Sequence, residues 1–320
     1  MRTIFNKTLI EIAEKDPRIH MVLADIGYGE IEGFARKFPD RYYNCGVMEQ
    51  HMTGVACGIA MEGNIAVTYS IANFPTLRCL EQIRNDVCYH NANVKIVNIG
   101  GGVSYGALGV SHHSTEDIAI LRALPNMVVV VPCDNIEAEA ATHAVFDYEG
   151  PVFYRCGYKN EKDIHHTDAK GLNFQLGKAI TVEEGDDCTI IFCGPIGFEA
   201  QKAVLAAREK GINCRLISMH TIKPIDKEAI IKAVMDTRRI ITVEDHNVIG
   251  GLGSAVAEVI VEAGKGCAFK QLGIPDKFAP IGLHEDIMSI LGIDCNGIIE
   301  AVREVMGKDF ELDDDWDDEA

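Results

Sequence analysis

The sequence contains no run of eighteen or more apolar residues, which excludes an ordinary membrane-spanning helix. Its first residues, MRTIFNKTLIEIAEKD, lack the apolar stretch and the small-residue cleavage site of a secretory signal peptide. We therefore expect a cytoplasmic protein that does not interact with membranes.

Paired cysteine motifs are also absent. The chain has 11 cysteines, none of them in a CxxC arrangement, and most lie in apolar runs. This pattern predicts buried free thiols rather than a disulfide framework. No set of convergent ligands at metal-binding spacing is evident, so the sequence predicts no metal site.

The chain has far fewer basic than acidic residues, which gives it a formal net charge of −18. Such an acidic chain is unsuited to nucleic-acid binding. Eight of the acids fall in 309–320 (DFELDDDWDDEA), and we expect this tail to be disordered. The alternative is that the tail docks on a basic partner surface.

Residues 1–165 alternate short apolar runs with helical patterns, which predicts parallel βαβ units. A polar connector is expected at 166–186, and a second α/β domain at 187–308. The glycine-rich stretch GGLGSA (250–255) lacks the context of a dinucleotide-binding loop. The predicted strands are 21–27, 66–71, 94–100, 127–134, 151–156, 188–194, 213–220 and 239–245, and the predicted helices are 3–14, 51–62, 76–89, 135–147, 197–210, 226–235, 251–263 and 296–306.

The stretch NCGVMEQHMTGVACGIA (44–60) places Glu49 at the head of a helix rich in small residues. An acid there can simply favour the helix N-terminus. The stretch also resembles the GIAEQ-type motif shared by transketolases, deoxyxylulose-phosphate synthases and the beta subunits of 2-oxo-acid dehydrogenases. The resemblance extends over residues 1–310, and the segments that carry it in the same order are FPTLRCLEQIRNDV (74–87), GALGVSHHSTEDIAILRALPNM (106–127), VVPCD (130–134) and GPVFYR (150–155).

The resemblance implies a thiamine pyrimidine-binding domain followed by a transketolase C-terminal-like domain, with Glu49 hydrogen-bonded to the aminopyrimidine of thiamine diphosphate. It assigns Phe74 and Tyr69 to aromatic contacts with that ring, although either could be a core aromatic. His112 matches a histidine that contacts the donor ketose and its oxygen in the reaction. His113 occupies the neighbouring position.

Three arginines match phosphate-contacting positions of these families. Arg155 matches the substrate-phosphate arginine, Arg2 one with a similar task, and Arg78 that of deoxyxylulose-phosphate synthases. Guanidinium groups bind phosphate in a bidentate manner, but each arginine could instead form a salt bridge. Asp25 aligns with an aspartate near the substrate entrance.

The GDG motif with which transketolases bind the diphosphate and its Mg²⁺ does not occur in this sequence. The resemblance therefore implies a partner subunit that carries this motif and supplies the diphosphate and metal ligands. The expected assembly is an α2β2 heterotetramer built around self-association of this chain.

Three positions depart from ordinary transketolase. Gly100 replaces a phosphate-contacting histidine, and Ala107 and Leu108 replace an acidic pair, one member of which selects sugar stereochemistry. The pocket is therefore expected to be less polar, which suits a sugar with a missing or branched hydroxyl or with a sulfonate.

The function that the resemblance implies is transfer of a two-carbon ketol unit from a ketose phosphate, or a modified ketose, to an aldose phosphate through a thiamine-bound carbanion. The alternatives are a 2-oxo-acid dehydrogenase or decarboxylase beta subunit, a deoxyxylulose-phosphate synthase-like enzyme, and a non-catalytic scaffold. Glu244, Asp245 and His246 in the second domain are expected to be structural.

Overall fold

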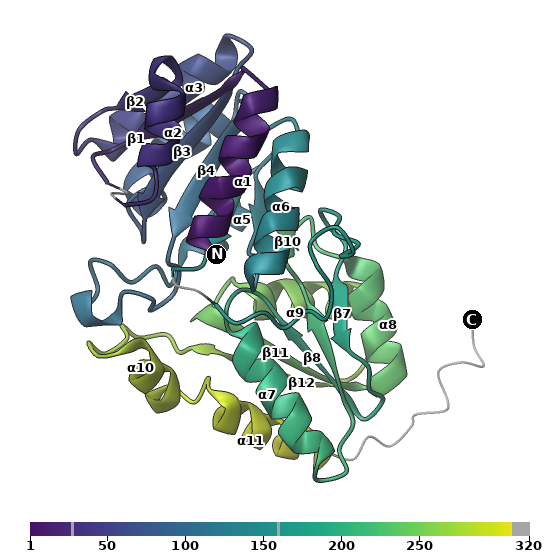
Figure 1. Cartoon of the computed structure of the whole chain (residues 1–320). Coiled ribbons are helices and arrows are strands. Elements are labelled where there is room, and N and C mark those ends of the chain that lie inside the picture. Colours follow the sequence, from purple (N-terminus) through teal and green to yellow (C-terminus); the bar gives the residue numbers. More distant parts are fainter. Residues whose placement is uncertain (27–28, 159–160, 309–320) are drawn as a thin grey trace.

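The computed structural model describes residues 1–26, 29–158 and 161–308, and in it the chain forms two α/β domains, each built on a mostly parallel sheet (Figure 1). The acidic tail 309–320, expected to be disordered, lies outside the described residues. Within the described part, no helix is long and apolar enough to span a bilayer. The predicted fold class is confirmed.

The first sheet has seven strands in the order β10-β5-β6-β4-β3-β1-β2. All neighbours are parallel except β10, which runs antiparallel to β5. Carboxyl ends of parallel strands share one edge, so loops that follow them in the sequence converge there. The strands are β1 (Ile19–Leu23), β2 (Tyr42–Asn44), β3 (Ile65–Ile71), β4 (Val94–Ile99), β5 (Val128–Val130), β6 (Val152–Cys156) and β10 (Thr221–Lys223).

Helices cover both faces of this sheet. α1 (Arg2–Lys15), α2 (Glu32–Lys37) and α6 (Asn135–Asp147) contribute to the core on one face, and α1 and α6 lie side by side (Figure 1). α3 (Glu49–Met61) and α5 (Asp117–Arg122) contribute to the core on the other face. Successive strand residues point to opposite faces, so neighbours in one strand enter different cores.

The predicted helix at 76–89 forms three short pieces: η2 (Leu77–Cys79), α4 (Leu80–Gln82) and the π-helical η3 (Ile83–Cys88). π-Helical turns occur often at functional sites, and this one packs beside α3. Two further 3₁₀ turns are η1 (Pro39–Arg41) and η4 (Gly106–Leu108).

The second sheet has five strands in the order β12-β11-β8-β9-β7, of which only β7 pairs antiparallel. β7 lies inside the stretch predicted as a connector. The elements are β7 (Ile180–Glu183), β8 (Cys188–Phe192), β9 (Cys214–Ser218), β11 (Arg239–Asn247), β12 (Ala268–Ile274), α7 (Gly197–Arg208), α8 (Lys227–Thr237), α9 (Leu252–Glu262), α10 (His284–Ile290) and α11 (Cys295–Met306).

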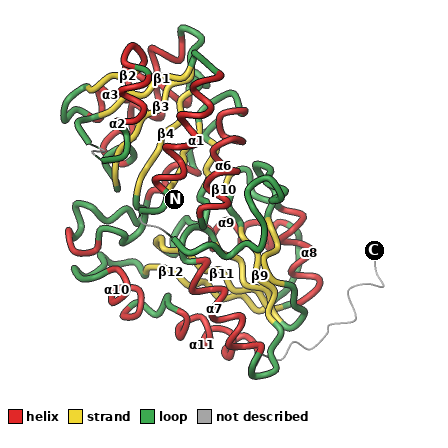
Figure 2. The backbone as a smooth tube through the Cα atoms, viewed as in Figure 1, coloured by secondary structure: helices red, strands yellow, loops and turns green. Residues whose placement is uncertain are grey.

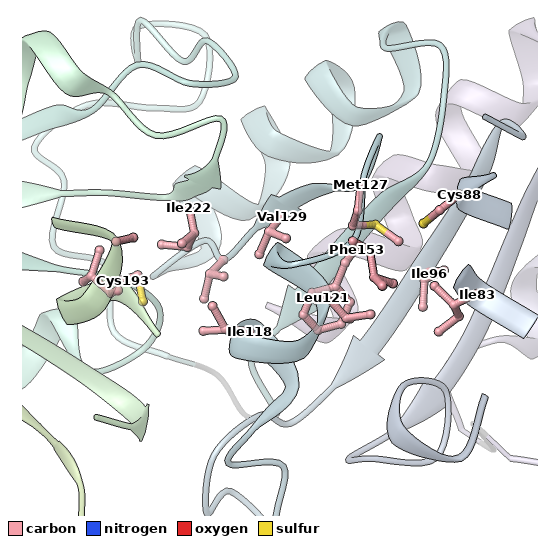
Figure 3. Packing of buried hydrophobic residues seen from close by; sticks show 14 of the residues in the cluster. Ile83, Cys88, Ile96, Ile118, Leu121, Met127, Val129, Phe153, Cys193 and Ile222 are labelled. Carbon is pink, nitrogen blue, oxygen red and sulfur yellow. The ribbon is translucent and has the colours of Figure 1, made fainter. Parts of the chain in front are cut away.

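The two domains share a hydrophobic core. β10 follows β9 in the chain but pairs with β5 of the first sheet. One buried cluster therefore runs from Ile96 and Phe153 in the first domain to Cys193 and Ile222 in the second (Figure 3). Because apolar packing is continuous there, the second domain supports the loops at the junction. The exact domain limits remain a prediction.

Loops make up much of the chain at this junction (Figure 2). Residues 100–116, between β4 and α5, contain only the short turn η4, and the described residues between β6 and β7 contain no helix or strand. All eleven cysteines are free, and all except Cys45, Cys267 and Cys295 are buried, so the prediction of buried free thiols holds for most of them.

Candidate active site

Glu49 is the first residue of α3 and lies at the carboxyl edge of the first sheet, soon after β2. Its side chain is 5% exposed, and its Oε1 accepts a 2.7 Å hydrogen bond from Arg78 Nη1. Among the described residues, Oε2 accepts no hydrogen bond. One oxygen of a nearly buried carboxylate is thus available to a donor on a ligand.

Arg78 connects this carboxylate to an aromatic group. Its Cζ lies 4.3 Å from the centroid of the Phe74 ring, and Phe74 meets the His112 ring edge-on at 5.1 Å between centroids. The Arg78 side chain is 45% exposed. Glu49, Arg78, Phe74 and His112 therefore form a continuous group, the Glu49 site, that is open to solvent on one side.

His112 and His113 occupy different environments. His112 Nδ1 lies 2.9 Å from the Ser111 hydroxyl, and burial, His113 and Arg78 together lower the pKa of His112. His112 is therefore neutral at neutral pH. His113 is buried, with Nε2 placed to donate to the Gly106 carbonyl at 3.3 Å. Its Nδ1 has no hydrogen-bond partner among the described residues.

Tyr105 explains the glycine at position 100. Gly100 has φ +79°, and a Cβ there would lie 2.5 Å from Tyr105 Cε2, so the tyrosine ring fills the space of a side chain. Tyr105 also lies 6.1 Å from the His112 ring and 4.5 Å from Tyr158, between centroids. We did not predict either tyrosine, although an aromatic residue inside the glycine-rich 100–109 loop was a visible signal.

The other two departures lie at the tip of the same loop. Ala107 and Leu108 are exposed, and 55% of Leu108 is accessible in the isolated chain. Gly109 packs against Ile281 of the second domain, where a Cβ would lie 3.0 Å from Ile281 Cδ1. The structure therefore shows an apolar loop tip where the resemblance implied an acidic pair.

Arg155 does not present its guanidinium to a ligand. It is 2% exposed: Nε donates to Asp117 Oδ2 at 2.9 Å, Nη1 to Asp245 Oδ1 at 2.5 Å, and Nη2 to the Ser114 and Asp245 carbonyls. Burial lowers the pKa of Arg155, but Asp117 and Asp245 outweigh burial and raise it well above its usual value. This geometry conflicts with the phosphate contact expected for Arg155, because carboxylates and carbonyls already accept hydrogen bonds from its guanidinium nitrogens.

Tyr69 also lies in a different place from the one that the expected contact with the cofactor ring requires. It is 1% exposed, belongs to the core formed with α1, and accepts a 3.3 Å hydrogen bond from Asn6 Nδ2. α3 and the residues packed on it lie on the opposite face. The side-chain alternation of β3 therefore directs Tyr69 away from Glu49.

Arg2 and Asp25 lie near the same sheet edge but have protein partners. Arg2 Nη2 donates to Glu30 Oε1 at 3.0 Å, and Arg2 Cζ lies 5.9 Å from the Tyr158 ring. Asp25 Oδ1 accepts from Asn44 Nδ2 at 3.0 Å. Within the described residues, Arg2 is thus linked to the Glu49 site through Tyr158 and Tyr105.

Glu244, Asp245 and His246 of β11, which we expected to be structural, have partners within the described chain. Glu244 accepts from the backbone N–H groups of Leu252 and Gly253 at the start of α9. Asp245 binds Arg155, and His246 Nε2 accepts from Ala119 N–H at 3.2 Å. Asp245 and His246 tie the second domain to the first.

Two family models match the chain, "Transketolase, pyrimidine binding domain" over residues 1–160 and "Transketolase, C-terminal domain" over residues 177–298. The chain belongs to the transketolase family. It is 40% identical over 308 residues to one subunit of the apulose-4-phosphate transketolase of Phocaeicola vulgatus, covering 96% of this chain and 97% of that protein.

Two other transketolase relatives extend the comparison. The 6-deoxy-6-sulfo-D-fructose transketolase subunit SqwH of a Clostridium species is 34% identical over 308 residues, covering 95% of this chain and 94% of that protein. The solved structure of a split gene transketolase, described as an inactive beta4 tetramer, superposes with a TM-score of 0.85 at 32% sequence identity. The superposition covers 95% of this chain and 97% of the chain in that structure. This chain is thus similar to separately encoded transketolase subunits over nearly its full length.

Proposed function

We propose that this chain is the pyrimidine-side subunit of a two-subunit transketolase that transfers a two-carbon ketol unit between sugars. The observation that carries the proposal is the Glu49 site: a nearly buried carboxylate with one unpartnered oxygen, beside an aromatic ring and a neutral histidine. The family membership supports a transferase of this type.

The residues of the site fit thiamine diphosphate. Glu49 Oε2 would accept from the aminopyrimidine, and Phe74 would pack against its ring. When bound, the cofactor supplies the electron-sink chemistry of ketol transfer, while the protein orients it. Glu49 would hold or move a proton at the ring nitrogen of the aminopyrimidine, and the low exposure of its carboxylate would strengthen that hydrogen bond.

His112 is the residue best placed to contact the sugar. Its neutral imidazole lies beside Phe74 and the solvent-open side of the site. A neutral imidazole can donate one hydrogen bond and accept another, which suits a hydroxyl or carbonyl oxygen of a ketose. Arg78, if released from Glu49, would provide the nearby cation for an anionic substrate group.

A partner subunit completes this proposal. The sequence holds no GDG motif, so the ligands for the diphosphate and Mg²⁺ would come from another chain. The relatives named as single transketolase subunits, and the solved beta4 tetramer described as inactive, support a chain that associates with itself but needs its partner for activity. We infer an α2β2 complex.

The substrate we propose is a ketose that lacks an ordinary hydroxyl pattern. Tyr105 fills the space beside Gly100, and Leu108 makes the loop tip apolar. Relatives named for apulose 4-phosphate and for a sulfonated fructose support a modified sugar. Faster turnover of xylulose 5-phosphate with ribose 5-phosphate than of branched or sulfonated ketoses would refute this part.

The test compares Glu49→Gln with wild type in the complex assembled from both subunits, thiamine diphosphate and Mg²⁺. Glu62→Gln, at the exposed end of the same helix, is the matched control. We expect Glu49→Gln to abolish ketol transfer without loss of folding, and Glu62→Gln to behave as wild type. Retention of activity by Glu49→Gln would remove the basis of the proposal, and inactivity of the complete wild-type mixture would favour a scaffold.

A further inference from the structure

Three side chains with metal-ligand atoms meet at the junction of the domains, away from the Glu49 site. Cys133 follows β5, Glu137 lies in the first turn of α6, and His165 comes from the loop after β6. His165 Nε2 lies 2.9 Å from Glu137 Oε1 and 3.8 Å from Cys133 Sγ, and the three ligand atoms lie within 4.8 Å of one another. We name these residues the Cys133 cluster.

We propose that the Cys133 cluster holds a divalent cation of the zinc class, which clamps the loop after β6 to the segment that joins β5 to α6. Thiolate, imidazole and carboxylate are the ligand types that Zn²⁺ accepts. With metal–ligand bonds of about 2.0 to 2.3 Å in a tetrahedral arrangement, ligand atoms lie about 3 to 4 Å apart. The separations of 2.9 and 3.8 Å already fall at or near this range without backbone movement.

The charges of the cluster also favour a cation. Glu137 and Asp134 are buried carboxylates close to the Cys133 thiol. Within the cluster, the His165 imidazole is the group that can balance their charge. A divalent cation bound by Glu137 and Cys133 would displace the thiol proton to solvent and balance the negative charges of the carboxylate and the thiolate.

Two further buried groups point to a ligand. Ser218 and His220 of the second domain are both wholly buried, and Ser218 faces Cys133 and Glu137. Neither Ser218 Oγ nor His220 Nε2 makes a hydrogen bond of regular geometry to any described residue. The His220 imidazole also interacts electrostatically with Glu137 and His165. Buried polar atoms without such partners are rare in folded proteins, and the Ser218 hydroxyl, which faces Cys133 and Glu137, offers a fourth contact through water.

The surroundings hold the ligands in position. Asp134 Oδ1 accepts from the Glu137 backbone N–H at 2.8 Å, while its Oδ2 accepts from the N–H groups of Ile164 and His165 at 2.9 and 3.3 Å. Such outer contacts orient metal ligands and are part of their affinity. No sequence pattern indicated the site, because His165 lies 28 residues after Glu137 in an irregular loop.

This inference is independent of the proposed ketol transfer, and the cation is distinct from the Mg²⁺ assigned to the partner. Its test uses the full chain, stripped with a chelator and titrated with Zn²⁺ and, in parallel, with Co²⁺. We expect one Zn²⁺ per chain and an ultraviolet thiolate-to-cobalt charge-transfer band. Cys133→Ser should lose that band and weaken Zn²⁺ binding by at least about tenfold.

Cys88→Ser is the matched control, because Cys88 is another buried thiol outside the cluster. It should bind both metals as wild type does. Glu137→Gln provides a second variant if Cys133→Ser fails to fold, and circular dichroism of each chain separates misfolding from loss of a ligand. Absence of stoichiometric Zn²⁺ in the wild-type chain, or a charge-transfer band that survives Cys133→Ser, would overturn the proposal and leave a His165–Glu137 ion pair.

Discussion

Arg78 and Arg155 both pair with carboxylates, yet they lie in opposite settings. Arg78 is half-exposed, binds one oxygen of Glu49 and lies over Phe74. Arg155 is wholly buried between Asp117 and Asp245, and backbone packs closely against it: a Cβ on Gly101 would lie 2.1 Å from its Nε. Both matched phosphate-contacting positions by resemblance.

The difference shows that burial and the number of protein partners decide whether an arginine keeps donors available for a ligand. All of the donor nitrogens of Arg155 have protein acceptors, so a phosphate would have to displace them. Arg78 retains exposed surface and shares its single carboxylate with an open site. The Arg155 cluster joins the two domains, whereas we propose that Arg78 serves the chemistry at the sheet edge.

The largest effect should come from Arg155→Met. Removal of one partner leaves Asp117 and Asp245 as buried, unpaired charges, which costs about 3 to 5 kcal/mol of unfolding free energy. Urea unfolding of the full chain measures it. Arg303→Met, in an exposed pair with Glu300, should change stability by less than about 1 kcal/mol. Equal effects of the two substitutions would contradict the distinction.

Arg78→Met should have the reverse profile. Arg78 is half-exposed but Glu49 is nearly buried, so the substitution leaves one carboxylate without its cation and should cost less stability than Arg155→Met, which leaves two. Ketol transfer in the assembled complex should fall by up to about a hundredfold, since Glu49 and any anionic substrate group lose their positioning cation. Steady-state kinetics and thermal melts, measured on the same preparations, give both values. A stability loss as large as that of Arg155→Met would show that Arg78 is structural too.

Lys95 differs from both arginines, because it is a buried basic residue whose hydrogen-bond acceptors are backbone carbonyls rather than carboxylates. It is wholly buried and donates to the carbonyls of Tyr148 and Gly150, and burial lowers its pKa to about 7. The unfolded chain then binds the proton more strongly, so the contribution of Lys95 to stability increases as pH rises from about 7 to about 10.4. Thermal melts of wild type relative to Lys95→Met should show this gain, and a constant difference across that window would contradict it.

The smallest effect should come from Tyr69→Phe. It removes one hydrogen bond with Asn6, which is worth about 1 kcal/mol. Because Tyr69 belongs to the core on the face opposite α3, cofactor affinity and ketol transfer in the complex should be unchanged. A raised Kd for thiamine diphosphate would restore the predicted cofactor contact.

Periodicity and motif order predicted much of the first domain, because buried parallel strands such as β5 are runs of apolar residues in the sequence. They missed β10, a three-residue strand whose partner β5 lies about ninety residues earlier in the chain. Periodicity also predicted a single helix at 76–89, where tertiary packing produces a π-helical turn.

The residues of the site were predictable only where local sequence decides their setting. Glu49 follows from its place at a helix start, and Phe74 and His112 from their motifs. The burial of Arg155 depends on Asp245, 90 residues away, and no local pattern reveals it. The face of the sheet on which the Tyr69 side chain lies depends on the register of its strand, and a resemblance at one position does not determine that register.

The central claim is that the Glu49 site is half of a catalytic site. Its most direct test measures ketol transfer with thiamine diphosphate and Mg²⁺ while this chain is titrated against the GDG-bearing subunit. We predict no transfer by either chain alone and a maximum rate at equal amounts of the two. Transfer by this chain alone, or a rate in the mixture that does not depend on the subunit ratio, would contradict it.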